Sequence, residues 1–475
     1  MNAQRTVTAT AMLSGSLAPL NSTMIVVALP SILTDLGAPL TWGSWIIVSY
    51  LVSMAAVQPL GGRLGDRYGD ARLLMAGLVC FLAASALAAL APNVIVLIVA
   101  RTAQALSGAI ALPNGSALIR RLVPFTSQGR AFGIVGAGIG VAAALGPPLG
   151  GVVTEALGWR MTFLANVAVI VPALLLAARL PRSVPPTEAA NDSELPAATQ
   201  VVTAAGRRGF DAPGAAGLVV ALVALALSLT IWRVPEAPAW ATPALVVVAL
   251  ATGAWLLRHL RRVAEPVLDL GLFGRSGFLA AGTTILLSNM VMYTIFIAVP
   301  LFLDQVLGWE PSSIGMMLAA MSVPMLALGP VGGALADRYG KRTPALIGCG
   351  VAALGVAWLT LLDANWSGVH LGLALAIVGL GVGLSSAPVH TAALHAAPRH
   401  QAGQAAGLFS TMRYLGSVIG SAGIAAILGV GAFAGAYRTA FTVLAAVSIC
   451  AVYSASRLPG REATAVANLG ATHSR

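Results

Sequence analysis

The chain has 475 residues, of which 58% are hydrophobic and only 9% are charged. Soluble globular domains carry about a quarter charged residues, so this composition excludes a soluble globule and indicates a polytopic membrane protein. The formal net charge of +11 would suggest a nucleic-acid partner in a soluble protein. In a membrane protein the placement of basic residues relative to the bilayer explains that charge, and no nucleic-acid partner is expected.

Apolar segments long enough to cross a bilayer, about 20 residues each, recur about fourteen times along the chain. They predict an all-α membrane protein. The first segment follows residues 1–10 without a small-residue cleavage site, so we interpret it as a retained span rather than a signal peptide. The predicted organisation is an N-terminal six-helix bundle (1–180), a polar cytoplasmic linker (181–213), two inserted spans with a basic loop (214–275), a C-terminal six-helix bundle (276–457) and a cytoplasmic tail (458–475).

Basic residues are distributed unevenly about these predicted spans. Arg101 and Arg413 fall within spans, three residues fall on one side (Arg160, Arg233 and Arg438), and the other 22 of the 27 Lys and Arg fall on the opposite side. Because cytoplasmic loops carry the excess of positive charge, this distribution predicts that both termini are cytoplasmic, with the protein in the plasma (inner) membrane.

A dense run of glycine and charge, residues 61–72, separates the second predicted span from the third. It recurs at residues 332–342, displaced by 271 positions, after the second span of the C-terminal bundle. Glycines let helix ends approach closely, and a carboxylate such as Asp66 can face an arginine or a helix N-terminus. A solvated loop is the alternative, but two copies in register favour an internal repeat with a conformational gate. The predicted gate residues are Gly62, Gly65, Asp66, Arg67, Gly69, Arg72, Asp337, Arg338 and Gly340.

The pattern Gly62-x-Leu64-x-Asp66-Arg67-x-Gly69 resembles the signature loop of the major facilitator superfamily. The resemblance covers nearly the whole chain and implies two six-helix bundles, a central cavity at mid-membrane and rocking of one bundle against the other. The two additional spans, preceded by Phe-Asp-Ala-Pro-Gly at residues 210–214, resemble the fourteen-span drug:proton antiporter branch of that family. This branch implies export of small amphipathic molecules, as in drug or antibiotic efflux, in exchange for protons.

The first predicted span resembles the corresponding motif of the antiporter branch, with one departure. The branch usually has Asp, a candidate proton carrier, where this chain has Asn21, whose amide forms hydrogen bonds but does not titrate. All 16 Asp and Glu residues lie in loops or near predicted span ends, and Asp304 is the nearest to the expected cavity. Proton coupling through Asp304, coupling through the Asp66 loop and no coupling at all therefore remain open.

The fourth predicted span places a charge in the hydrocarbon region. Arg101 lies several residues from either end of the span, where a translocon scale assigns a cost of about 2.5–3.5 kcal/mol, so a partner or a wet cavity is expected. Together with Gln104 it resembles the superfamily's fourth-helix motif, whose arginine is associated with proton transfer. An arginine that extends outward to the membrane interface is the alternative.

The fifth predicted span combines small residues at helical spacing with a proline that bends the helix. This string resembles the antiporter motif of exporters, and of the sequence features it favours export over import most specifically; close helix packing alone is the alternative. The following segment, residues 158–166, also resembles that branch, although its Trp and Arg are equally typical of an interfacial anchor. The residues assigned to the antiporter motif are Gly133, Gly146, Pro147, Gly150 and Gly151.

Two positive charges within the spans, with no carboxylate deep in any span, predict the charge of the substrate. Arg101 and Arg413, the latter beside Tyr414, would repel a cationic ligand and favour a neutral or anionic amphipathic one. The other expected partners are protons and the lipid bilayer, and a monomer is expected. The residues predicted for proton coupling or the substrate cavity are Asn21, Arg101, Gln104, Asp304, Arg413 and Tyr414.

Three other functions remain open. A metabolite uniporter or importer of the same fold is favoured by Asn21 and disfavoured by the fifth-span motif. A membrane-embedded lipid enzyme would need acidic or His clusters at the interface, whereas the acidic residues are scattered singly. A sensor that has lost transport is the third. No nucleotide-binding Gly-x-x-x-x-Gly-Lys sequence is present, and no catalytic residue, metal site or cofactor is predicted.

Overall fold

The computed structural model describes residues 3–180, 211–231, 238–263, 266, 270–362, 366–397, 402–428 and 434–460. These residues form helices joined by short turns and contain no strand, so the predicted all-helical fold class is confirmed for the described chain. Residues 181–210 of the predicted linker and 461–475 of the predicted tail lie outside the described residues. Gly62, Asp66 and Arg67 of the predicted gate are described as helical backbone only.

The N-terminal half consists of five long helices and a broken sixth. They are α1 (Ala3–Asp35), α2 (Leu40–Tyr68), α3 (Asp70–Ala89), α4 (Val94–Leu122), α5 (Phe125–Leu157), and the consecutive α6 (Arg160–Leu164) and α7 (Val167–Ala177). Two of the tight turns use glycines with positive φ, 95° at Gly69 and 83° at Gly158, which other L residues rarely adopt. These turns reverse the chain in very few residues, so that successive helices run antiparallel.

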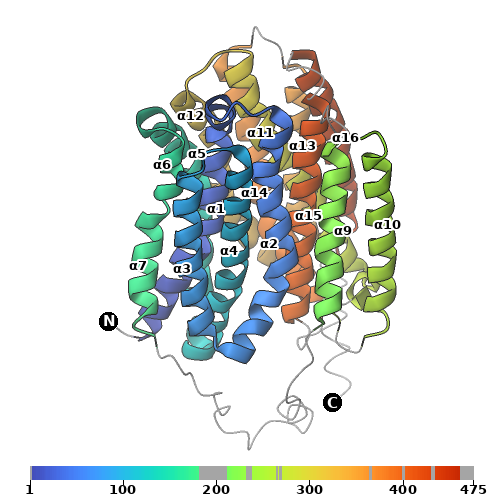
Figure 1. The fold of residues 1–475 in the computed structure, drawn as a ribbon. Helices are drawn as coiled ribbons and strands as arrows, with labels where there is room; N and C mark the ends of the chain where they lie inside the picture. Colours follow the sequence, from blue (N-terminus) through green and yellow to red (C-terminus); the bar gives the residue numbers. More distant parts are fainter. Residues whose placement is uncertain are drawn as a thin grey trace, which may run out of the picture.

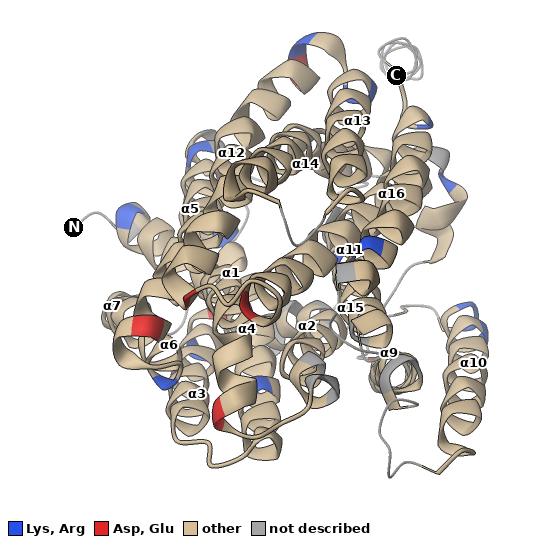
Figure 2. Cartoon of the chain, turned by 90° about the horizontal axis from the view of Figure 1, so that it is seen from above, with Lys and Arg blue, Asp and Glu red and all other residues tan. Residues whose placement is uncertain are grey.

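The C-terminal half repeats this arrangement after an intervening helical pair. The pair is α9 (Ala212–Thr230) and α10 (Ala241–Leu260), followed by the short η3 (Leu270–Gly274); the second half comprises α11 (Ser276–Gln305), α12 (Pro311–Tyr339), α13 (Arg342–Leu359), α14 (Gly368–Ala396), α15 (Ala402–Leu428) and α16 (Ala434–Ser456). Seen along the helix axes, the two halves lie side by side, and α9 packs on α2 and α15 with α10 outermost (Figure 2).

The start of α1 and the end of α16 lie at the same end of the bundle (Figure 1). We call this end the termini side and the opposite end the far side. The two halves meet mainly through α5 with α12, α2 with α15, and α1 with α11. Arginine and tyrosine side chains of both halves come together between these helices, as described below.

Twelve helices of the described chain are long and apolar enough to cross a membrane. The fourteen spans expected from the sequence are therefore not established by the structure. Among the described side chains, α2 and α9 contribute shorter apolar stretches, Trp45–Gln58 and Ala212–Ser228, each below the about 20 residues of a full span. Outward-facing apolar side chains such as Leu250, 69% exposed, are consistent with a lipid surrounding.

Glycines let the helices of the C-terminal half approach at backbone distance. A Cβ added at Gly416 of α15 would overlap the Leu286 carbonyl oxygen of α11. One turn further along, the Thr294 hydroxyl donates a hydrogen bond of 3.1 Å to the Gly420 carbonyl oxygen. Small residues are the usual means of close helix packing in lipid, where van der Waals contact replaces the hydrophobic driving force.

Replacing Gly416 with Ala should destabilise the protein, because the new methyl group meets the backbone of α11; overpacking of this kind costs about 1–3 kcal/mol. The matched control is Gly423→Ala on the same helix, where an added Cβ meets no atom within 4 Å. Thermal unfolding of purified protein in detergent, followed by size-exclusion chromatography, measures both variants. Equal melting temperatures for the two variants would contradict the close α11–α15 contact.

Candidate substrate and gating sites

Arg101 of α4 is buried in the N-terminal half, with 1% of its surface exposed. Its Nε donates to the Ile46 carbonyl oxygen and its Nη1 to Gln104 Oε1, both at 3.2 Å, and its guanidinium lies 4.2 Å from the centre of the Tyr50 ring. Within the described chain it has no carboxylate partner. A carbonyl, an amide and an aromatic face therefore replace the water that this cation would lose in hydrocarbon.

Asn21 and Gln104 extend this contact into a network of uncharged groups. Asn21 Nδ2 donates to Gln104 Oε1 at 3.4 Å, and Asn21 Oδ1 accepts from Asn166 Nδ2 at 3.1 Å. Gln104 Nε2 donates to the Ser85 hydroxyl at 2.8 Å. The structure thus brings together three residues selected from the sequence, Asn21, Arg101 and Gln104. The sequence analysis did not identify the roles of Ser85 and Asn166. Each is a polar residue in an apolar segment, and that was the only signal available in the sequence.

Tyrosines join the buried arginine to the C-terminal half. Tyr293 of α11 lies close enough to both Arg101 and Arg413 for their charges to interact with its hydroxyl. The Arg413 guanidinium of α15 lies 5.0 Å from the ring centre of Tyr414, and Tyr50 interacts electrostatically with Tyr293 and Tyr414. We call these five side chains the Arg–Tyr cluster; it spans α2, α4, α11 and α15 and therefore both halves.

Asp304 does not join the Arg–Tyr cluster. It lies at the far-side end of α11, half-buried, and the group that it influences is Tyr437 of α16. The carboxylate expected nearest to the cavity is thus separated from both arginines, and its role in proton coupling stays a prediction.

The glycines assigned to the antiporter motif of α5 face two different helices. A Cβ at Gly146 would overlap the Thr23 hydroxyl of α1, and one at Gly150 would lie 2.7 Å from Met24 Cα of the same helix. On the other face, Gly151 lies against the Pro311 carbonyl oxygen of α12. A Cβ added at Gly133 would meet no atom of the described residues within 4 Å, so this position shows no close helix contact there.

The contact between α5 and α12 forms a seam between the two halves on the far side. We define this far-side seam by Pro147, Gly151 and Glu155 of α5 and by Pro311, Ser312 and Gly315 of α12. Toward the termini side, a Cβ added at Gly140 would still meet the Leu326 side chain, but one added at Gly136 of α5 or Gly329 of α12 would meet no atom of the described residues within 4 Å. The backbones of α5 and α12 are therefore in close contact on the far side only.

Glu155 closes the end of this seam. Its Oε2 accepts a hydrogen bond of 3.0 Å from the backbone N–H of Ser312, in the first turn of α12. The first N–H groups of a helix lack partners within the helix and favour a negative charge. A carboxylate of the N-terminal half therefore caps a helix of the C-terminal half, a pairing that the sequence analysis did not identify.

In the first copy of the predicted gate, the described charge contact is made by Asp70. Its Oδ2 lies 2.9 Å from Arg121 Nε, with 2% of the Asp70 side chain and 33% of the Arg121 side chain exposed. A Cβ at Gly65 would overlap Asp70 Oδ1 and Asn114 Oδ1, and Asn114 Nδ2 donates to the Gly61 carbonyl oxygen at 3.0 Å. The start of α3 is thus tied to the end of α4. Asp66, the centre of the sequence prediction, lies outside the described side chains, and Arg72 is exposed.

The second copy of the gate has a different chemistry. Asp337 and Arg338 are exposed, and Gly340 forms the turn with φ of 84°. Lys341, which corresponds to Asp70 of the first copy, has its Nζ 2.6 Å from His395 Nδ1. Burial lowers the pKa of the Lys341 amine. The repeat therefore preserves the backbone turn but not the sign of the charge.

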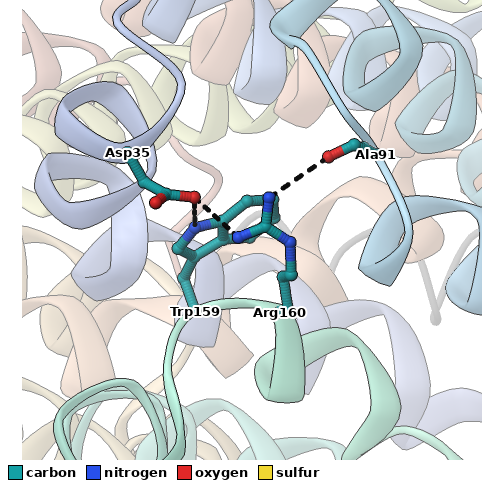
Figure 3. Close-up of polar contacts among 4 residues, drawn as sticks. All are labelled: Asp35, Ala91, Trp159 and Arg160. Carbon is teal, nitrogen blue, oxygen red and sulfur yellow. Dashed lines mark hydrogen bonds and ion pairs between the residues drawn. The ribbon is translucent and has the colours of Figure 1, made fainter.

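The segment after α5 makes a polar clamp on the far side of the N-terminal half (Figure 3). Asp35, the last residue of α1, accepts from Trp159 Nε1 at 3.0 Å and pairs with Arg160 Nη1 at 2.6 Å. Arg160 also reaches the Ala91 carbonyl oxygen at 3.5 Å. Trp159 and Arg160 thus connect the end of α1 to the turn between α3 and α4, beyond the interfacial anchoring that their residue types suggested.

A family model of the Major Facilitator Superfamily matches residues 11–421, and the chain belongs to this family. It is 32% identical to the uncharacterized MFS-type transporter YvkA of Bacillus subtilis, over 93% of each chain. It is also similar to a probable actinorhodin transporter of Streptomyces coelicolor (32% identity, 85% of this chain, 68% of that protein). A multidrug resistance protein B homolog of Mycobacterium tuberculosis is 28% identical, over 88% of this chain and 74% of that protein.

Among solved structures, a D-xylose-proton symporter superposes with a TM-score of 0.67 at 16% identity, over 96% of this chain and 98% of that chain. This similarity concerns the fold alone. The family, together with twelve apolar helices in the described chain, makes the protein a multi-pass membrane transporter, a class that is not enzymatic in general.

Replacing Asp70 with Asn should lower the stability of the N-terminal half, because it leaves Arg121 without its carboxylate; loss of a partner of this kind costs about 1–3 kcal/mol. The control is Asp337→Asn, at an exposed carboxylate for which the described chain offers no ion-pair partner. Chemical denaturation of the purified protein measures both. An equal, small effect of the two substitutions would show that the Asp70–Arg121 pair does not hold the loop.

Replacing Glu155 with Gln should shift the protein toward a state opened on the far side, because the amide keeps an acceptor oxygen but loses the charge that favours the α12 N-terminus. The control is Glu310→Gln, since Glu310 precedes α12 and makes no side-chain capping bond. Spin labels at positions 157 and 313, in a background without the native cysteines, report the α5–α12 separation. Unchanged distance distributions in Glu155→Gln would contradict the capping role.

Proposed function

We propose that this transporter exports small amphipathic molecules, neutral or anionic, by alternating access coupled to proton antiport. The observation that carries the proposal is the packing of α5, whose small residues contact α1 on one face and α12 on the other. Such a helix can act as the pivot between two rigid halves. The resemblance of its sequence to the antiporter motif supports export, as do relatives whose names refer to multidrug resistance and to an actinorhodin transporter.

In this mechanism the far-side seam opens while the termini-side gate closes. The gate comprises the loop that contains Asp66 and its counterpart that contains Asp337. Substrate binds at the Arg–Tyr cluster, because that cluster combines side chains of both halves and is therefore rearranged when one half rotates against the other. The buried guanidinium of Arg101 holds its own half together through α2 and α4.

The proposed topology follows the distribution of basic residues, with both termini in the cytoplasm of a cell whose plasma membrane holds the protein. In this arrangement α2 and α9 also cross the bilayer, which gives the fourteen spans of the antiporter branch, and the protein works as a monomer. The termini side is then cytoplasmic and the far side external.

A uniporter or importer of the same fold is the second candidate, and one observation favours it. The position where the antiporter branch has a titratable Asp is occupied by Asn21, which bonds to Gln104 and Asn166. Proton coupling must then use a carboxylate outside this network, such as Asp304 or Asp66.

Everted membrane vesicles test the proposed direction and coupling. An inside-acidic pH gradient should drive accumulation of neutral or anionic fluorescent dyes, a protonophore should abolish it, and dye addition should raise the internal pH. Asp66→Asn should remove transport but leave dye binding near the wild-type level, because the gate moves the halves without contacting substrate. Dye entry that only equilibrates and is insensitive to the gradient would establish uniport, and uptake by right-side-out vesicles against a concentration gradient would establish import.

A further inference from the structure

Arg413 differs from Arg101 in that its guanidinium makes no hydrogen bond within the described chain. Two N–H donors of Arg101, on Nε and Nη1, bond to the Ile46 carbonyl oxygen and to Gln104 Oε1. Arg413 lies near the middle of α15 (Ala402–Leu428), half-buried, and its close contact is the ring of its neighbour Tyr414. Within the described chain its guanidinium has neither a carboxylate nor a hydrogen-bond acceptor.

The surroundings of Arg413 are aromatic. His390 of α14 lies close enough for its ring to interact with the Arg413 charge, and the same ring lies 5.2 Å from the ring of Phe409, one turn before Arg413 on α15. Tyr293 approaches from α11. Phe409 is 4% and Tyr414 9% exposed, whereas His390 is exposed, so a ligand can reach the imidazole without displacing the packed rings.

The described carboxylates of the C-terminal half lie at the ends of helices, whereas Arg413 lies near the middle of α15, so they do not neutralise its charge. Asp304 lies at the far-side end of α11, beside Tyr437, Glu310 lies just before α12 on the same side, and Asp337 lies at the termini-side end of α12. A cation in a membrane interior is costly unless it is paired. The missing partner is therefore expected to come from outside the chain.

We propose that Arg413 and His390, with the rings of Tyr293, Phe409 and Tyr414, form the docking site for an aromatic organic anion, a carboxylate or a phenolate. This inference names the substrate class of the proposed exporter and rests on that function for its physiological meaning. The guanidinium offers paired N–H donors that match a carboxylate, and a neutral imidazole adds one more donor. The partly exposed ring of Tyr293 offers contact to an aromatic group, and the buried rings of Phe409 and Tyr414 pack behind His390 and Arg413. Arg101, which is 1% exposed and bonded to Ile46 and Gln104, positions Tyr50 and is not the anion-binding residue.

Three probes that share one ring system test the charge preference. They are 1-naphthoate, 1-naphthalenemethanol and 1-naphthalenemethylamine, which near neutral pH are an anion, a neutral molecule and a cation, because carboxylic acids ionise near about pH 4 and alkyl amines near about pH 10. Isothermal titration of the purified full-length protein measures each. The wild-type protein should bind the anion about tenfold or more tightly than either other probe, as a charge-assisted hydrogen bond provides.

Variants locate the site. Arg413→Gln should abolish the preference for naphthoate while leaving the alcohol unaffected, and Arg413→Lys should retain part of the preference. Arg438→Gln, at an exposed position of α16, is the matched control and should behave as wild type. Size-exclusion profiles and melting temperatures verify folding, and the comparison of probes on wild-type protein does not depend on any variant.

Two results overturn the proposal. One is a wild-type protein that binds naphthoate no better than the alcohol, including a protein that binds neither. The other is a folded Arg413→Gln variant that keeps the full preference. Because binding in detergent needs no transport, failure of vesicle export with an intact Arg413-dependent preference would refute the proposed export and leave the anion site standing.

Discussion

The buried guanidinium of Arg101, which has no carboxylate partner among the described residues, constrains how the helices of the N-terminal half pack. In hydrocarbon, the charge of Arg101 must be stabilised by groups that the protein itself supplies. The Ile46 carbonyl brings α2 close, the Gln104 side chain shares the same helix, and Tyr50 covers the cation. Gln104 Oε1, which accepts from the arginine, also accepts from Asn21 of α1, and Gln104 Nε2 donates to Ser85 of α3. The Gln104 side chain therefore also positions α1 and α3. The positions of four helices thus follow from one charge.

The same network gives a physical reason for Asn21. Its amide nitrogen donates to Gln104 Oε1 while its amide oxygen accepts from Asn166. An ionised Asp could accept from Asn166 but would present a second acceptor to Gln104 Oε1, with no proton between the two oxygens. Asn21 therefore bonds to both Gln104 and Asn166, which an ionised Asp at this position could not do.

Hydropathy and internal repetition predicted the helical class, the two halves and the turn at Gly69 with its counterpart at Gly340, because these depend on local composition and backbone freedom. Glycine spacing predicted that α5 packs closely, but not that Gly146 faces α1 while Gly151 faces α12. Contacts such as Asp70 with Arg121 and Glu155 with Ser312 join residues far apart in sequence, so no local pattern could reveal them. The fourteen spans expected from hydropathy include α2 and α9, whose described apolar stretches are shorter than those of the twelve long apolar helices.

The two copies of the gate loop share the same backbone turn, at Gly69 and Gly340, but carry opposite charges at the next position, Asp70 and Lys341. In the first copy, Asp70 at the start of α3 pairs with Arg121, the penultimate residue of α4. In the second, Lys341 before α13 contacts His395, the penultimate residue of α14. The first contact is attractive whenever the carboxylate is ionised, whereas the second holds only while His395 is neutral and accepts the proton of the amine. On the termini side, the Asp70–Arg121 contact therefore holds the N-terminal half more strongly than the Lys341–His395 contact holds the C-terminal half. A rocking motion can release the weaker contact.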